Sequence, residues 1–296
     1  MECAKIVPAV KSERIYEMAR DFLRPHEKVS CQLSELLGKQ NKNVFTVLSM
    51  CGESLSVRGI VYCSKGGTVL PFFKNTDESL KQPLIDFFTG RKIFCVSGES
   101  SSVDFLTGIL LSLGNQGVME RRGFISMESV RPVDVPAKDG AGKIRADIEG
   151  HDFFQCTRKR SDELFSMQIE YIREEVLPDG MTLNLPVERL ETDRLLKNGK
   201  IYAIVSPGGK ILCKAQVNGE CGSCILIGGV YTDKLHRRKG FARMMMESLK
   251  SLAAQKEKSC VLFVNKLNAA AISLYEKTGF RKIGEHEIVY MSQASD

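Results

Sequence analysis

The segment 228–246 has the sequence GGVYTDKLHRRKGFARMMM and places an apolar strand, a basic loop and a helix in direct succession. The strand ends near Thr232, where the apolar run stops. From Gly240 onward, apolar residues such as Met244 and Leu249 recur at helical spacing. We therefore predict a strand over 223–232, a short loop and an amphipathic helix over 240–255.

The start of this helix has the properties of an anion site. Its first N–H groups lack partners within the helix, and the helix dipole adds partial positive charge there. Gly240 and Ala242 keep bulky side chains away from the backbone, so a phosphate can approach closely. The loop also carries four basic residues: Arg237, Arg238, Lys239 and Arg243. We predict that residues 238–243, with Phe241 among them, bind a phosphate or pyrophosphate.

Other interpretations of the basic loop are weaker. The chain has neither a G-x-x-x-x-G-K-[ST] nor a G-x-G-x-x-G motif after a strand, so a P-loop or Rossmann site is unsupported. A solvated basic turn or a nucleic-acid patch would explain the charge alone. The small residues at the junction of strand and helix favour a bound anion over both.

A second segment, 268–280, reads NAAAISLYEKTGF. Asn268 is a good N-cap and Gly279 a good residue to follow the last helical turn, so a helix over 268–278 is bounded at both ends. Tyr275 lies at helical spacing from Ala271 and Leu274. Its side chain could pack in the core, or its hydroxyl could donate a proton at the edge of a cleft.

The same order of elements occurs twice along the chain: two helices, three strands, then helix, strand, helix and strand. The segment 132–142 (PVDVPAKDGAG) separates the halves and reads as a linker, so we place the boundary near residue 140. The expected ranges are 12–23, 29–38, 44–50, 56–63, 67–73, 78–89, 92–97, 101–113 and 118–127 in the first half, and 161–176, 186–197, 201–206, 210–217, 223–232, 240–255, 260–264, 268–278 and 281–291 in the second.

The composition excludes several classes of protein. With 296 residues, 43% of them hydrophobic and 26% charged, the chain is expected to be globular. It has no long apolar run for a membrane span and no secretory signal, so we expect a cytoplasmic protein without a membrane partner. The ten cysteines stand mostly alone in apolar segments and are expected to be buried free thiols. The close pair Cys221 and Cys224 is expected in a hairpin, and no metal site is predicted.

The two segments together resemble the signature of the GCN5-related N-acetyltransferases (GNATs). Arg237-x-x-Gly240-x-Ala242 is similar to that family's Arg/Gln-x-x-Gly-x-Gly/Ala motif, and the segment 268–280 is similar to a later motif. The resemblance covers residues 150–296 and implies an α+β fold of tandem GNAT-like (acyl-CoA N-acyltransferase) domains, each with a mixed, mostly antiparallel sheet flanked by helices. Residues 1–140 would form a degenerate domain and 141–296 the catalytic one.

The resemblance also implies a reaction and roles for individual residues. Acetyl-CoA would lie in a splay between the strands ending at Thr232 and over 260–264, with backbone groups of Val230 and Thr232 pairing with its pantetheine arm. The amides of residues 238–243 would hold the pyrophosphate. Asn268 would contact the CoA arm, and Tyr275 would protonate the leaving thiolate. A small-molecule amine or an exposed protein amine would attack the thioester directly.

The general base is less well determined by the sequence. Glu170 and Glu174 share one face of the helix expected over 161–176, one turn apart, and could bind a cationic amine or take its proton through water. A solvated acidic face is an alternative of equal or greater weight. Glu285, His286 and Glu287 in the last strand are further candidates without a stronger claim.

The first half lacks the residues expected for CoA binding. Its counterpart of the basic loop is 71–80 (PFFKNTDESL), which contains no glycine and carries Asp77 and Glu78. We expect a GNAT-like domain that completes the acceptor pocket or stabilises the active half; the alternative is a different α+β fold that recruits a partner. For the whole chain, the alternatives to an acetyltransferase are a non-catalytic acyl-CoA sensor and, less favoured, a nucleic-acid-binding protein.

Overall fold

The computed structural model describes residues 3–51, 54–129, 150–178 and 180–293. The expected linker over 132–142 and the expected boundary near residue 140 lie outside the described residues. The chain divides into two compact units that are discontinuous in sequence. Unit 1 comprises Met1–Ser126, Val264–Leu267 and Lys282–Asp296, and unit 2 comprises Met127–Phe263 and Asn268–Arg281.

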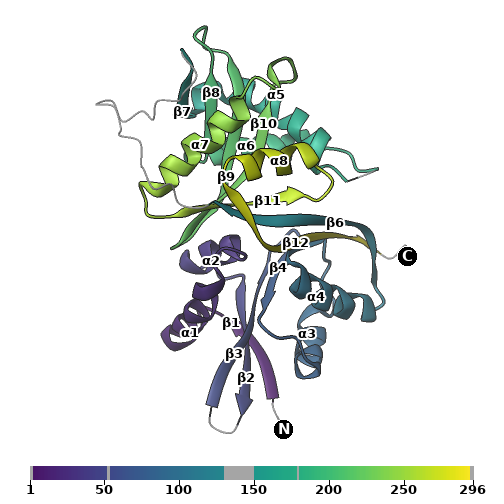
Figure 1. Ribbon diagram of the computed structural model, residues 1–296. Coiled ribbons are helices and arrows are strands. Elements are labelled where there is room, and N and C mark those ends of the chain that lie inside the picture. Colours follow the sequence, from purple (N-terminus) through teal and green to yellow (C-terminus); the bar gives the residue numbers. More distant parts are fainter. Residues whose placement is uncertain (1–2, 52–53, 130–149, 179, 294–296) are drawn as a thin grey trace. The chain divides into compact units, whose positions relative to one another are not determined.

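Unit 1 is a sheet with helices on both faces (Figure 1). Its strands follow the order β1-β2-β3-β4-β5-β12-β6. Neighbours from β1 to β4 are antiparallel, β4 and β5 are parallel, and β12 is antiparallel to β5. Helices α1 and α2 lie on one face, and α3 and α4 on the other. The elements are β1 (Cys3–Pro8), α1 (Glu13–Leu23), α2 (Cys31–Gly38), β2 (Val44–Cys51), β3 (Ser54–Cys63), β4 (Thr68–Phe73), α3 (Lys81–Phe88), β5 (Cys95–Glu99), α4 (Ser100–Ser112), β6 (Gln116–Ser129) and β12 (Phe280–Gln293).

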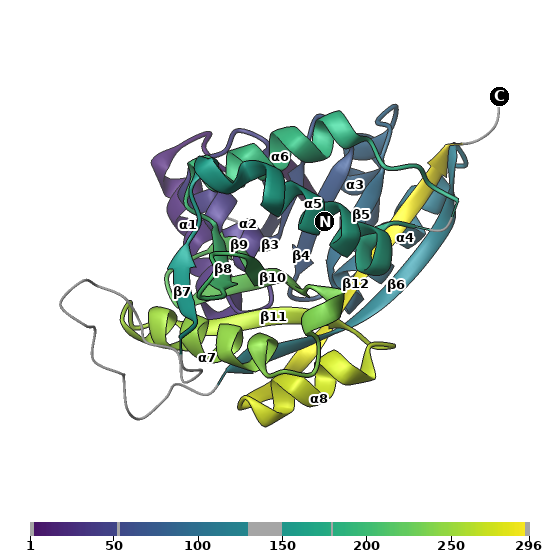
Figure 2. The same cartoon turned by 90° about the horizontal axis from the view of Figure 1, so that it is seen from above.

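Unit 2 repeats this arrangement. Its strands follow the order β11-β10-β9-β8-β7, with β10 and β11 parallel and the other neighbours antiparallel. Helices α5 and α6 cover one face, and α7 and α8 the other (Figure 2). The elements are β7 (Asp152–Gln155), α5 (Ser161–Tyr171), a π-helical turn (Ile172–Val176), α6 (Leu185–Lys197), β8 (Ile201–Val205), β9 (Ile211–Glu220), β10 (Cys224–Thr232), α7 (Phe241–Ala254), β11 (Ser259–Asn265) and α8 (Ala269–Lys277).

The structure confirms the α+β class, with mixed, mostly antiparallel sheets flanked by helices, and the repeated order of elements. It corrects the sequence prediction at the start of each half, where β1 and β7 were missed. Both are short strands at a sheet edge, and each pairs with one neighbour only. Such strands show too few alternating residues to be recognised from periodicity. The helix expected over 161–176 is also not uniform, because its last turn is π-helical.

Apolar side chains fill both faces of the unit 1 sheet and the α5–α6 face of unit 2. Val47, Val96, Leu106 and Val289 belong to one unit 1 cluster, and Leu23 and Ile60 to the other. In unit 2, Leu164 of α5 packs with Ala203 and Ile211 of the sheet.

The cysteines whose side chains are described are free thiols, and all of them are buried except Cys63, which is partly exposed. Burial raises the pKa of Cys156 and of Cys260 to about 12, and that of Cys213 to about 11. These three thiols therefore stay protonated at neutral pH and are poor nucleophiles.

Among the helices of the described residues, none combines the length and the apolar character that crossing a bilayer requires.

The core of unit 1 predicts a large difference between two otherwise equal substitutions. Leu84 of α3 is fully buried, whereas Leu111 of α4 is 42% exposed. We expect Leu84→Ala to lower the free energy of unfolding by about 2–5 kcal/mol, because it removes buried methyl groups and leaves a cavity. Leu111→Ala should cost under about 1 kcal/mol. Urea denaturation followed by circular dichroism measures both, and equal losses would contradict the assigned core.

Candidate functional site

The loop before α7 presents a glycine-led helix start with no side-chain cap. Gly240 occupies the N-cap position with φ 88°, a left-handed conformation that glycine adopts without a Cβ penalty. No side chain caps the first turn of α7 by a hydrogen bond. Phe241 is buried and anchors the helix, whereas Arg238, Lys239 and Arg243 are exposed around its start. The structure thus brings the predicted residues 238–243 together at one uncapped helix N-terminus.

Arg237, the first residue of the motif, differs from its basic neighbours. Its guanidinium donates to Glu174 Oε2 at 2.7 Å and to the carbonyl oxygen of Thr232 at 3.2 Å. It also lies over the ring of Tyr231, 5.3 Å from the ring centre. The hydrogen bond to Glu174 raises the pKa of Arg237 further above its usual value. Arg237 therefore links the basic loop to the π-helical turn after α5 through an ion pair.

The two predicted carboxylates meet at the hydroxyl of Tyr231. This hydroxyl donates to Glu170 Oε2 at 2.7 Å and lies 3.2 Å from Glu174 Oε1. Lys234 also forms an ion pair with Glu174, with 2.9 Å between Nζ and Oε1. Burial alone would raise the pKa of Glu174, but the hydrogen bonds from Lys234 and Arg237 outweigh it and lower the pKa. Glu174 is therefore ionised and neutralised by two cations, while Glu170 accepts from the tyrosine.

The π-helical turn directs the next carboxylate to a different element. Asn268 caps α8, because its Oδ1 accepts from the N–H of Ala271 at 3.0 Å. Its Nδ2 lies 3.2 Å from both carboxylate oxygens of Glu175. Neighbouring residues on a helical turn point in different directions, so Glu174 reaches the basic loop while Glu175 reaches α8.

Tyr275 of α8 is buried, with 8% of its surface exposed. Burial raises the pKa of its hydroxyl well above the usual value, and Tyr171, Cys213 and Glu175 act in the same direction. The hydroxyl therefore stays protonated at neutral pH. That state is required of a proton donor, although a buried tyrosine of the core would share it.

Strands β10 and β11 pair over only part of their length. Their parallel pairing ends at Ile227 and Leu262, although β10 continues to Thr232 and β11 to Asn265. Immediately beyond this point the register of β10 against β9 shifts between Gly228, which pairs with Gln216, and Tyr231, which pairs with Lys214.

The shift is a β-bulge at Gly229 and Val230, because these two residues face a single residue of β9. Gly229 has φ 56°, and a Cβ at this position would come within 2.8 Å of the side chain of Gln216. The positive φ and this close contact both favour glycine at the bulge. It interrupts the regular ladder of β10 at the point where β10 and β11 separate.

Lys214 of β9 is a feature that sequence reasoning missed. Its side chain is 1% exposed, and its Nζ donates to Gln168 Oε1 at 2.7 Å and to the carbonyl oxygen of Gly229 at 3.0 Å. The Nζ also lies 4.9 Å from the centre of the Tyr171 ring. Burial lowers the pKa of Lys214 to about 7. The only sequence signal was a lysine within the apolar run 211–215, which alternation would assign to a solvated face.

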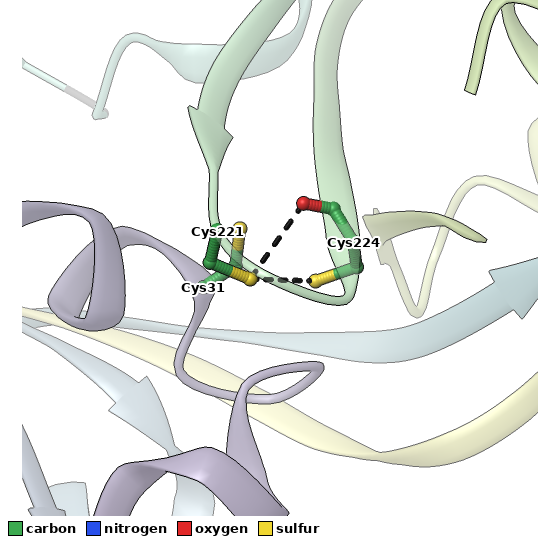
Figure 3. A group of neighbouring side chains, drawn as sticks. All are labelled: Cys31, Cys221 and Cys224. Carbon is green, nitrogen blue, oxygen red and sulfur yellow. Dashed lines mark hydrogen bonds between the residues drawn. The ribbon is translucent and has the colours of Figure 1, made fainter. Parts of the chain in front are cut away.

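The pair Cys221 and Cys224 closes the hairpin between β9 and β10, as expected. The N–H of Cys221 donates to the carbonyl oxygen of Cys224 at 3.0 Å. Figure 3 shows the two sulfur atoms, which lie 3.3 Å apart, and the contact of 3.6 Å from Cys221 Sγ to the same carbonyl oxygen. Cys31, which Figure 3 also labels, belongs to unit 1.

The remaining predicted acid and base candidates belong to unit 1. Glu285 pairs with Lys266 at 2.7 Å and Lys282 at 2.8 Å, and these hydrogen bonds lower its pKa to about 2. His286 lies 3.0 Å from the hydroxyl of Ser97, and burial lowers its pKa to about 3. Glu287 forms an ion pair with Arg121. These three residues therefore belong to a different unit from Glu170 and Glu174.

Residues 221–289 match the family model described as FR47-like protein. This range contains both motifs, the bulge and Tyr275. No sequence among curated proteins matches the chain.

Solved structures match nearly its whole length at low identity. A Drosophila protein has a TM-score of 0.64 at 12% identity, covering 96% of this chain and 98% of that one. A GCN5-related N-acetyltransferase from Sphaerobacter thermophilus has 0.58 at 12%, covering 99% and 95%. A tandem GNAT protein from the clavulanic acid biosynthesis pathway has 0.57 at 10%, covering 100% and 99%. This likeness identifies the fold as the tandem GNAT fold, which confirms the predicted architecture.

The buried amine predicts a pH dependence of stability. Lys214 has a pKa of about 7 in the folded protein against 10.5 for the unperturbed side chain. Between these values the unfolded state binds more protons, so the free energy of unfolding rises with pH. We expect the difference in unfolding free energy between the wild type and Lys214→Met to change steadily from pH 7 to 10 in favour of the wild type. Urea denaturation at several pH values measures it, and parallel pH curves would contradict the assignment.

Proposed function

We propose that this chain, which has the tandem GNAT fold and matches the FR47-like family over residues 221–289, transfers an acetyl group from acetyl-CoA to a primary amine. The observation that carries the proposal is the sequence of elements in unit 2: a bulged β10 that parts from β11 and leads into an uncapped, glycine-led α7. This arrangement offers backbone donors to a thioester and, further along, to a pyrophosphate.

The pyrophosphate of acetyl-CoA binds at the start of α7 in this proposal. The amides of residues 238–243 donate to its oxygens, and the exposed side chains of Arg238, Lys239 and Arg243 add positive charge. Arg237 holds the loop in place through Glu174. The pantetheine arm lies where β10 and β11 separate and pairs with backbone groups of Val230 and Thr232. Asn268, at the start of α8, contacts the same arm.

The acetyl group then passes directly to the amine. The nitrogen attacks the thioester carbon, the carbon–sulfur bond breaks, and Tyr275 protonates the departing thiolate. Glu170 binds the acceptor amine or takes its proton through water, because its carboxylate lies beside Tyr231. Glu174 already has two cationic partners, so its larger contribution is to orient Arg237. The acceptor is a small-molecule amine or an exposed protein amine.

Unit 1 is proposed to be a degenerate domain without CoA. The contrast with α7 supports this, because the loop before α3 carries Asp77, which caps the short 3-10 turn Glu78–Leu80 and accepts from the N–H of Ser79 at 2.9 Å. It also pairs with Arg58. The hydrogen bond from Ser79 is the largest cause that lowers the pKa of Asp77. A fixed negative charge with its own partners competes with a pyrophosphate at the same position.

Binding of acetyl-CoA is tested by thermal unfolding. Saturation at 100 times the dissociation constant stabilises a protein by about 2.7 kcal/mol, which should raise the melting temperature by about 5 °C or more. Gly240→Glu should abolish this shift, because it places a carboxylate at the pyrophosphate site.

The matched control is Gly209→Glu, which introduces the same side chain at another glycine with positive φ (81°) that has open space around it. This variant should be less stable because of backbone strain, but its melting temperature should still rise with acetyl-CoA. The proposed site would be contradicted if acetyl-CoA did not raise the melting temperature of the wild type, or if both variants lost that rise equally.

Turnover separates an enzyme from a sensor of acyl-CoA. With a panel of amines, release of free CoA thiol should be detectable for the wild type. Tyr275→Phe should lower kcat by roughly 100-fold while the thermal shift with acetyl-CoA persists, because only the proton donor is removed. A thermal shift without turnover on any amine would favour the sensor.

A further inference from the structure

We propose that Lys214 is a positioning residue for the thioester: it holds the carbonyl oxygen of Gly229 so that the amide of Val230 points at the thioester oxygen and donates to it strongly. This inference rests on the proposed function, since it concerns the same bulge. It gives a buried side chain of β9, outside both motifs, a part in the reaction.

The argument begins with the peptide unit between Gly229 and Val230. The carbonyl of Gly229 and the N–H of Val230 belong to one planar group and point in opposite directions. A donor that fixes the carbonyl therefore fixes the direction of the N–H as well. The 3.0 Å contact from Lys214 Nζ to the Gly229 oxygen is such a donor.

The bulge makes this contact necessary. Gly229 and Val230 stand opposite a single residue of β9, so the regular ladder does not define this peptide plane. Glycine at 229 is also the residue with the greatest conformational freedom. Lys214, on the neighbouring strand β9, fixes the orientation of this peptide plane. Its Nζ is in turn held by Gln168 of α5 at 2.7 Å.

Lys214 does more to this peptide than an apolar residue of similar size could. A hydrogen bond to a carbonyl polarises the whole peptide group, and a positive charge on the donor strengthens that effect in a buried site. The polarised N–H then stabilises the negative charge that develops on the thioester oxygen. Burying a lysine costs free energy, and within the described part of the chain no carboxylate pairs with its Nζ. The stronger polarisation of the Gly229–Val230 peptide accounts for a lysine at this buried position.

The surroundings of the amine determine its charge. Besides its two hydrogen-bond acceptors, the ring of Tyr171 of α5 lies 4.9 Å from the amine, Tyr231 of β10 is the ladder partner of Lys214, and Cys156 after β7 and Cys213 on the same strand act on its pKa. In the neutral form, its two N–H groups match its two acceptors, Gln168 and Gly229. In the protonated form, the additional N–H faces the ring of Tyr171, where a cation is favourable. Both states are accommodated, so the amine can titrate near neutral pH without losing its contact with the bulge.

Lys214→Met tests the role in turnover. Methionine keeps the length and apolar stem but removes the donor. We expect kcat to fall by about 10- to 100-fold, with KM for acetyl-CoA unchanged within about twofold, because the amide is weakened mainly in the transition state. The matched control is Lys256→Met, the same substitution at an exposed lysine of unit 2 that pairs with Glu220. It should keep wild-type kcat. An unchanged kcat in a folded Lys214→Met protein would overturn the inference.

A second measurement does not depend on activity. In protein labelled with 15N-valine, the amide of Val230 is assigned from the peak lost in Val230→Ile. Its chemical shift should titrate with a midpoint near pH 7 in the wild type, and Lys214→Met should abolish the titration. A Val230 amide that ignores both pH and the substitution would overturn the inference. Absent turnover together with the expected titration would contradict the proposed function but support the contact between Lys214 and this peptide.

Discussion

The β-bulge at Gly229 and Val230 determines how β10 runs through the candidate site. Parallel pairing of β10 with β11 stops at Ile227, and the bulge follows at once. Beyond it, β10 places Tyr231 beside the carboxylates of Glu170 and Glu174 and leads into the basic loop. A bulge bends its strand and leaves extra backbone groups outside the ladder. The end of the β10–β11 pairing, the interrupted β9–β10 ladder and the start of the basic loop therefore lie within a few residues of one another.

Two pairs of polar side chains hold β10 and the loop after it. Lys214 and Gln168 contact the bulge, while Arg237 and Glu174 hold the loop that follows. Both pairs involve the same helical segment, because Gln168 lies in α5 and Glu174 in the π-helical turn that extends it. Such turns are rare and occur often at functional sites. Here the turn lets Glu174 and Glu175 reach different elements of the same unit.

The two units share one order of elements but differ in the residues that precede α7 and α3. Gly240 begins α7 without a side-chain cap, whereas in unit 1 Asp77 caps the 3-10 turn Glu78–Leu80 that precedes α3. A carboxylate close to a helix N-terminus opposes the approach of an external anion. Both units nevertheless keep apolar cores of the same kind, since burial of apolar side chains does not depend on the loop.

The sequence by itself determined the order of elements, the repeat and the two motifs, because helical and strand periodicity and the small residues at 240 and 242 are local properties. It missed β1 and β7, whose pairing at a sheet edge leaves little periodic signal. Only the tertiary structure decided that Glu174 is neutralised by Arg237 and Lys234, that Glu285 to Glu287 belong to the other unit, and that Lys214 is buried against Gly229. These facts depend on contacts between residues far apart in the chain, where burial and charge pairing are set by neighbours that no local pattern records.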